Sequence, residues 1–132
     1  MKKTIHTDQA PAAIGTYSQA IRAGNTIYIS GQIPLNPKTM TMVDGDFHAH
    51  VKQAFNNLKA VVTAANAVLS DIVKLTIFLR DMNQFSIVNE IMATYFVAPY
   101  PARAVVEVSR LPKDALIEMD AIVCVTSQPF AA

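Results

Sequence analysis

Apolar side chains recur along this chain with two periods, and these periods predict its secondary structure. Alternation of apolar and polar residues is typical of strands, whereas recurrence every three to four residues is typical of helices. The alternating pattern predicts six strands, over residues 4–6, 18–23, 26–30, 72–79, 103–108 and 115–124. Between the second and third strands, Gly24-Asn25 is suited to the positive φ of a two-residue hairpin turn.

Two stretches carry the helical spacing. The first covers Phe47–Ala65, with Asp46 placed to cap its N-terminus and Asn66 placed to end it in a left-handed conformation. The second follows Asp81 or Asn83, either of which can act as its cap. Each helix has one apolar stripe, so each is expected to cover one face of a sheet.

The segments between these elements are predicted to be loops. Asp8–Gly15 is rich in Pro, Ala and Gly, and the tail Thr126–Ala132 is expected to be irregular. Pro34–Asp46 is long for a connection without structure, which indicates an internal turn or a segment that covers a site. The order of elements predicts one α+β domain over residues 1–132, a mixed β-sheet with both helices packed on one face.

Composition adds an expectation about assembly. Only 16% of the residues are charged and 52% are apolar, so a domain of 132 residues is expected to retain apolar surface after folding. The chain offers no third layer for the second face of the sheet, and a neighbouring copy is the simplest cover. We therefore expect a homo-oligomer.

Charge and cysteine content exclude other classes. The net charge is +1 and no basic run extends beyond Lys2-Lys3, so the footprint of a nucleic-acid or anionic-membrane binder is missing. The N-terminus is too polar for a signal peptide and no apolar run approaches membrane-spanning length, which predicts a cytoplasmic protein. The single cysteine, Cys124, is expected to be a buried, inert thiol.

The last two strands contain charges among apolar neighbours. Arg103 and Glu118 each lie in such a strand, where an unpaired buried charge costs several kcal/mol. One interpretation is an internal pair of Arg103 with Glu118 or Asp120. The other is a ligand site, since Arg103 begins its strand next to a loop. The register is open, because a shift of one residue in the loop 111–114 moves the two charges to opposite faces.

The remaining chemistry is limited. The sequence has no Gly-rich phosphate loop, no metal-ligand set and no Gly-x-Ser-x-Gly motif, and His48 and His50 point in different directions on a helix. What remains is Arg103, whose planar fork matches a carboxylate, and Glu118 as a possible acid or base. No metal or cofactor is predicted.

Small polar groups accompany this pair. Tyr17 and Ser30 flank the hairpin, Gly31 marks either a bulge or a close backbone approach to a ligand, and Asn89 lies inside the second helix. Residue types alone indicate a site for a small carboxylate.

Several motifs together resemble the reactive intermediate deaminase family, of the RidA or YjgF type. They are Gly15-Thr16-Tyr17-Ser18-Gln19, Ser30-Gly31-Gln32-Ile33-Pro34, Phe85 through Val88-Asn89, Pro101-Ala102-Arg103 through Val106-Glu107-Val108, and Leu111 through Glu118. The resemblance implies a chorismate-mutase-like fold and a homotrimer with clefts between subunits. It implies a 2-iminobutanoate/2-iminopropanoate deaminase that hydrolyses 2-imino acids, in equilibrium with enamines such as 2-aminoacrylate and 2-aminocrotonate, to 2-keto acids and ammonia.

The resemblance also assigns roles. It makes Arg103 the group that binds the substrate carboxylate and Glu118 the acid that orients or activates water. The implied substrate-binding positions are Tyr17, Ser30, Gly31, Asn89 and Val105. Two residues depart from the family pattern: Thr16 stands where many members have Pro, and Val105 stands where some bacterial members have Cys.

Two other functions are open at this stage. One is a non-catalytic trimer that binds keto acids or other small carboxylates as a sensor or chaperone-like protein, and it would use the same Arg103. The other is an endoribonuclease or translation inhibitor, which the near-neutral charge disfavours. The expected partners are therefore a small imino or keto acid and further copies of the chain, without nucleic acid or membrane.

Overall fold

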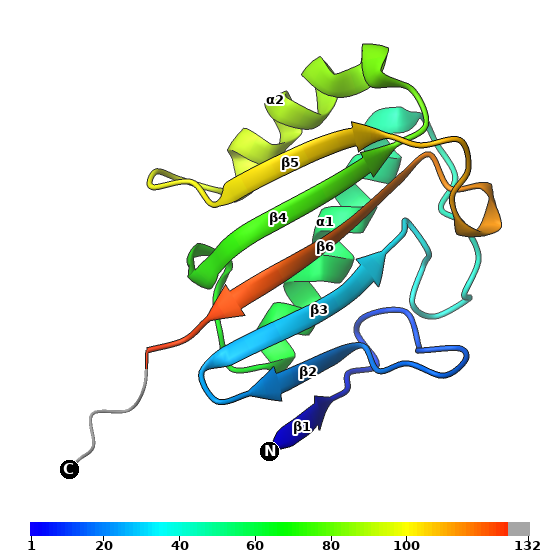
Figure 1. The fold of residues 1–132 in the computed structure, drawn as a ribbon. Coiled ribbons are helices and arrows are strands. Elements are labelled where there is room, and N and C mark those ends of the chain that lie inside the picture. The colour runs from blue at the N-terminus through cyan, green and yellow to red at the C-terminus, as the bar shows by residue number, and fades with distance from the viewer. Residues whose placement is uncertain (127–132) are drawn as a thin grey trace.

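A six-stranded sheet organises the chain (Figure 1). The computed structural model describes residues 1–126. The strands are β1 (Lys2–Ile5), β2 (Ala20–Ala23), β3 (Thr26–Gln32), β4 (Ile72–Leu79), β5 (Ala102–Glu107) and β6 (Ile117–Cys124). The helices are α1 (Phe47–Ala64) and α2 (Phe85–Tyr95), with short 3₁₀ turns η1 (Leu69–Asp71), η2 (Met82–Gln84) and η3 (Pro112–Asp114).

The strand order, β1-β2-β3-β6-β4-β5, separates the last two strands of the chain. β6 lies antiparallel between β3 and β4, and β5 pairs parallel to β4 at the edge. An internal cross-strand pair of Arg103 with Glu118 or Asp120 is therefore wrong as an interpretation. The reason is burial: β6 has a completely buried apolar face, which favours a central position, whereas most of β5 is exposed.

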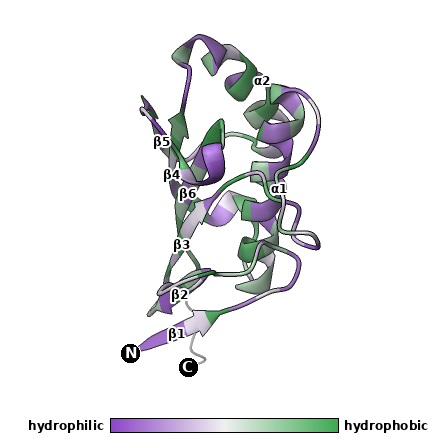
Figure 2. Ribbon diagram, turned by 90° about the vertical axis from the view of Figure 1, so that its right-hand side faces the viewer, coloured by the Kyte–Doolittle hydropathy of each residue, from purple (hydrophilic) through white to green (hydrophobic). Residues whose placement is uncertain are grey.

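Both helices cover the same face of the sheet, as predicted (Figure 2). α1 packs on β3, β6 and α2, and the odd-numbered residues of β6 from Ile117 to Val123 are buried beneath it. The even-numbered residues of β6 point to the other face, which no helix of the described part covers. That face exposes apolar side chains, among them Tyr28 and Val106. We call it the open face.

The turn and cap predictions are confirmed for the first half of the chain. Gly24 takes a φ of 61° in the hairpin turn, Asp46 accepts a hydrogen bond from the Ala49 amide at 3.1 Å, and Asn66 has a φ of 60°. The prediction for the second helix is wrong in detail. Asp81 caps η2 by accepting from the Asn83 amide, and α2 itself begins without a side-chain cap.

Two further predictions need correction. The first strand covers Lys2–Ile5 rather than 4–6, because all four of its residues pair with β2. Cys124 is exposed rather than buried, since it is the last residue of β6 and belongs to the open face. Most of the tail predicted to be irregular, residues 127–132, lies outside the described residues. Within residues 1–126, no helix is both long enough and apolar enough to cross a bilayer.

A buried amide connects α1 to the segment that follows β3. Asn57 is 1% exposed, and its Nδ2 donates to the carbonyl oxygens of Ile33 at 3.0 Å and Leu35 at 2.9 Å. Buried carbonyl groups without a partner are costly, so this side chain fixes where the chain leaves the sheet.

We expect Asn57→Ala to destabilise the fold by about 1–3 kcal/mol, because it leaves these buried carbonyl groups without donors. Asn56→Ala is the matched control, since Asn56 is exposed and accepts one hydrogen bond from the Tyr95 hydroxyl. It is expected to change stability by less than about 0.5 kcal/mol. Urea unfolding measures both, and equal losses would contradict the role given to Asn57.

Candidate functional site

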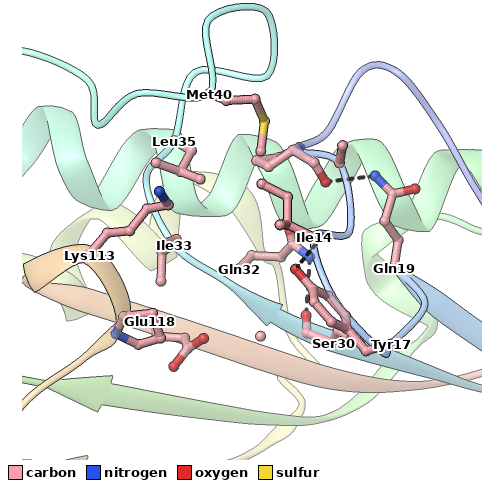
Figure 3. A pocket seen from close by; sticks show the side chains of 14 residues that line it. Ile14, Tyr17, Gln19, Ser30, Gln32, Ile33, Leu35, Met40, Lys113 and Glu118 are labelled. Carbon is pink, nitrogen blue, oxygen red and sulfur yellow. Dashed lines mark hydrogen bonds between the residues drawn. The ribbon is translucent and has the colours of Figure 1, made fainter.

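One cavity brings together four of the predicted site residues. Tyr17, Ser30, Gly31 and Glu118 line a hollow of about 600 Å³ at one end of β3 and β6 (Figure 3). The rest of its lining is Pro11, Ala12, Ile14, Gln19, Gln32, Ile33, Leu35, Met40, Pro112 and Lys113. Most of this lining is apolar, and Glu118 supplies its carboxylate. We call this hollow the Glu118 cavity.

A bulge in β3 makes room for the carboxylate. Ile29 pairs with Ala121 and Gln32 with Met119, so two residues of β3, Ser30 and Gly31, lie opposite one residue of β6. A Cβ atom at Gly31 would overlap the Glu118 carboxylate and lie 2.8 Å from its Cδ. Of the two sequence interpretations of Gly31, the bulge is confirmed. The group that approaches its backbone is the Glu118 side chain.

The hydroxyl groups beside this cavity are oriented by backbone contacts. The Ser30 hydroxyl donates to the Ser18 carbonyl oxygen at 2.6 Å, and the Tyr17 hydroxyl accepts from the Ile14 amide at 3.3 Å. Because the Tyr17 hydroxyl accepts this bond, it keeps its own proton for donation. Gln19 is 3% exposed and holds the loop that precedes Tyr17. Its Oε1 accepts from the Thr7 amide, and its Nε2 donates to three carbonyl oxygens of residues 7–11.

The environment of Glu118 favours its protonated form. Burial raises the pKa of Glu118, and the neighbouring Asp120 carboxylate raises it further. Burial also raises the pKa of Asp120, which Lys74 and a hydrogen bond from Thr76 oppose. A carboxyl group whose pKa is raised in a cavity is a better proton donor and acceptor for catalysis than one that titrates at its ordinary, lower pH.

Arg103 lies beside a second cavity, of about 420 Å³, lined by Asn89, Met92, Ala93, Tyr100, Pro101 and Arg103 itself. Its Nη1 donates to Asn89 Oδ1 at 2.8 Å and contacts Met92 Sδ at 3.5 Å, and its guanidinium lies 5.1 Å from the centre of the Phe85 ring. Among residues 1–126, none of the ion pairs includes Arg103. We call this hollow the Arg103 cavity.

This geometry leaves the guanidinium ready for an anion. Both of its hydrogen bonds within residues 1–126 use Nη1, so Nε and Nη2 are available to bind a carboxylate with two parallel hydrogen bonds. Three neutral side chains orient the group, and none of them neutralises its charge.

The two charged residues lie on opposite faces of the sheet. Arg103 is level with Leu75 of β4 and points to the helix side, whereas Glu118 is level with Phe78 and points to the open face. Three residues along the strand and two strands across place their Cα atoms roughly 14 Å apart. One chain therefore cannot present both groups to one small ligand.

The structure places the other predicted residues as follows. Asn89 is the partner of Arg103, and Val105 packs against the hydrophobic core and lines neither cavity. Sequence reasoning missed Phe85 and Met92 as contacts of Arg103. Their spacing with Asn89, at i, i+4 and i+7, puts all three on one side of α2 and is the signal that could have found them.

No group of three or more His, Cys, Asp and Glu side chains within residues 1–126 is arranged to hold a metal ion. His48 lies 3.8 Å from Asp46, and both side chains are largely solvent-exposed. His50 is only partly exposed, and its buried Nδ1 has no hydrogen-bond partner among residues 1–126. Neither histidine lines the two cavities.

The comparisons with known proteins all indicate the same protein family. Residues 7–125 match the family described as endoribonuclease L-PSP. A RutC family protein of Pyrococcus horikoshii is 52% identical, with 92% of this chain and 97% of that protein aligned. An Escherichia coli protein named 2-iminobutanoate/2-iminopropanoate deaminase is 50% identical, also with 92% of this chain and 97% of that protein aligned. The crystal structure of RidA from Psychrobacter is similar with a TM-score of 0.90 and 46% identity, covering 93% of this chain and 99% of that one.

The raised pKa of Glu118 predicts a pH-dependent stability. The group ordinarily titrates near 4.5, and ionisation costs more in the folded state than in the unfolded state. Stability is therefore lost as the pH rises from that value through the raised pKa. Glu118→Gln cannot ionise, so its stability relative to wild type is expected to be greater at pH 7 than at pH 4.

Urea unfolding at both pH values measures this difference. Glu90→Gln, at an exposed position on α2, is the control for the loss of one carboxylate. A Glu118→Gln variant whose relative stability falls between pH 4 and pH 7 would contradict the effect of burial.

Proposed function

The chain belongs to the endoribonuclease L-PSP family, which includes the RidA and YjgF-type proteins, and from this membership we propose that it is a hydrolytic deaminase of 2-imino acids. The proposed substrates are 2-iminopropanoate and 2-iminobutanoate, with their enamine forms 2-aminoacrylate and 2-aminocrotonate. The products are 2-keto acids and ammonia. The name of the relative at 50% identity supports this substrate class.

The observation that carries the proposal is Arg103 with neutral partners and two free donor positions beside a cavity. Every 2-imino acid has a carboxylate next to the reacting carbon, and a guanidinium binds such a group in a defined orientation. Binding in a defined orientation lowers the barrier, because the reacting atoms are held close together.

We further propose that the site is completed between copies of the chain. Arg103 and Glu118 lie on opposite faces of one sheet, so a small substrate can touch both only if they come from different subunits. The open face carries apolar side chains beside Glu118, and a neighbouring copy would bury them. A homotrimer with three equivalent sites satisfies this requirement with closed symmetry.

The proposed reaction needs one water molecule and no cofactor. The Glu118 carboxylate accepts a proton from the water molecule as the water oxygen adds to C2, and it passes this proton to the imine nitrogen. The resulting carbinolamine gives its hydroxyl proton to the same nitrogen by way of Glu118 and loses ammonia, which breaks the C–N bond, forms the C=O bond of the keto acid and returns Glu118 to the carboxylate form. Proton transfer by a positioned carboxyl group contributes roughly 10²–10⁴-fold. The Tyr17 and Ser30 hydroxyl groups and the Gly31 backbone line the same cavity and can orient the water.

An assay with a threonine dehydratase, which releases the imine, tests the activity against the spontaneous rate of keto-acid formation. Arg103→Ala is expected to cost about 2–5 kcal/mol of substrate binding, or roughly 30-fold to several thousand-fold in kcat/KM. Arg22→Ala is the matched control, since Arg22 lines neither cavity. A wild-type rate equal to the spontaneous one would instead favour a non-catalytic sensor or chaperone-like binder of keto acids. RNA binding with a steep salt dependence would favour a ribonuclease.

Mixing two inactive variants tests the shared site. Trimers are assembled from equal amounts of Arg103→Ala and Glu118→Gln chains. In half of the sites, the chain that supplies position 103 has an intact Arg103. Independently, in half of the sites, the neighbouring chain has an intact Glu118. Roughly a quarter of the sites are then complete, and activity is expected to return to about that level. If the mixture, unfolded and refolded together, stays inactive, the site is not shared.

The pH dependence of kcat/KM tests the role of Glu118. The Asp120 carboxylate raises the pKa of Glu118, so Asp120→Asn is expected to move the limb that reports Glu118 to lower pH. Glu118→Gln is expected to remove this limb. Profiles that coincide for wild type and Asp120→Asn would argue against Glu118 as the titrating group.

A further inference from the structure

Met40 combines an unfavourable backbone conformation with a place in the Glu118 cavity. Four residues other than glycine within residues 1–126 have positive φ: Met40, Asn66, Lys113 and Asp114. Asn and Asp tolerate this region, whereas Met and Lys adopt it rarely. Both Met40, with a φ of 59°, and Lys113, with a φ of 55°, line the cavity that contains Glu118. Strain of this kind is concentrated at functional sites.

The surrounding loop holds Met40 in this conformation. The Met40 amide donates to the Asn36 carbonyl oxygen at 2.8 Å, and the Asn36 amide donates to the Thr41 carbonyl oxygen at 2.8 Å. Asn36 Oδ1 accepts from the Lys38 amide at 2.8 Å, and Leu35 and Met42 form an isolated bridge at the base of the loop. The turn therefore fixes the backbone at Met40.

The Met40 side chain faces the apolar part of the cavity. Figure 3 shows Met40 and Leu35 on one side of the view and the Glu118 carboxylate on the other, with Ile33 between them. If water is activated at Glu118, the C2 substituent of the substrate has this apolar wall to extend along. Methionine is flexible and apolar, so it can adapt to side chains of different shape.

We propose that Met40 is a specificity-determining residue, which closes the Glu118 cavity around the side chain of the substrate and favours imino acids with extended apolar side chains. This inference rests on the proposed deaminase activity. It assigns recognition of the substrate side chain to the Glu118 cavity, whereas Arg103 binds only the carboxylate that all of these substrates share.

The test compares two imines produced by an amino-acid oxidase, one from leucine and one from alanine. The quantity measured is the ratio of their kcat/KM values. Met40→Ala removes most of the side chain, and Met40→Gly removes it and also relieves the positive φ. Both are expected to lower the ratio of the leucine imine to the alanine imine by roughly 10-fold, the lower end of what a hydrophobic pocket discriminates.

Two control variants make the test specific. Met40→Leu keeps an apolar side chain of similar volume and is expected to retain most of the wild-type ratio. Asn66→Gly also places glycine at a positive φ, here 60°, at the end of α1 and outside the Glu118 cavity. It is expected to leave the ratio of the two kcat/KM values unchanged. Thermal unfolding, with midpoints within a few degrees of wild type, verifies that every variant is folded.

The outcomes separate this inference from the proposed function. If the wild-type protein hydrolyses both imines, and the ratio of their kcat/KM values is the same in Met40→Ala and Met40→Gly as in wild type, the role of Met40 is overturned. The deaminase activity would still stand. A fall in the ratio for Met40→Leu as large as for Met40→Ala would also overturn it, because an apolar side chain would then not be the determinant. Absence of turnover of either imine by wild type would overturn both proposals.

Discussion

The alternation of side chains across a single sheet is the constraint from which the rest of this structure follows. Residues of β5 and β6 with odd numbers face the helices, so Arg103 reaches α2, and residues of β6 with even numbers face away, so Glu118 lies on the open face. No rotamer change moves a side chain through the sheet. The cation and the carboxylate are therefore separated within each chain, and joining them requires a second chain.

The separation of the Arg103 guanidinium from the Glu118 carboxylate connects the proposed assembly of the chain with its proposed chemistry. The open face has two acidic side chains, Glu118 and Asp120, next to apolar ones such as Phe78 and Ile122. In the proposed oligomer, a subunit packed on the apolar part would also displace water from the edge where Glu118 lies. Desolvation already raises the pKa of Glu118 in the single chain, and further exclusion of water acts in the same direction until a cation approaches.

Much of this arrangement could be predicted from the sequence, and the exceptions have physical causes. Periodicity predicted the helices and strands, and the order of these elements predicted both helices on one face of the sheet. Strand order could not be read locally, because pairing of β6 between β3 and β4 depends on burial contributed by distant segments. Cys124 was expected to be buried because its strand is apolar, but it ends β6 on the open face. Met40 carries no motif, and only the structure shows its positive φ and its place in the Glu118 cavity.

The groups around Arg103 are neutral, as expected for an arginine that binds an anion rather than one that only stabilises the fold. A carboxylate at the position of Asn89 would orient the guanidinium more strongly, but it would also neutralise the charge that an incoming anion needs. An amide oxygen, a thioether and an aromatic face orient the group and leave its charge in place. Since Asn89 and Met92 are on the same helix as Phe85, the position of α2 relative to β5 sets the direction in which Arg103 presents its free donors.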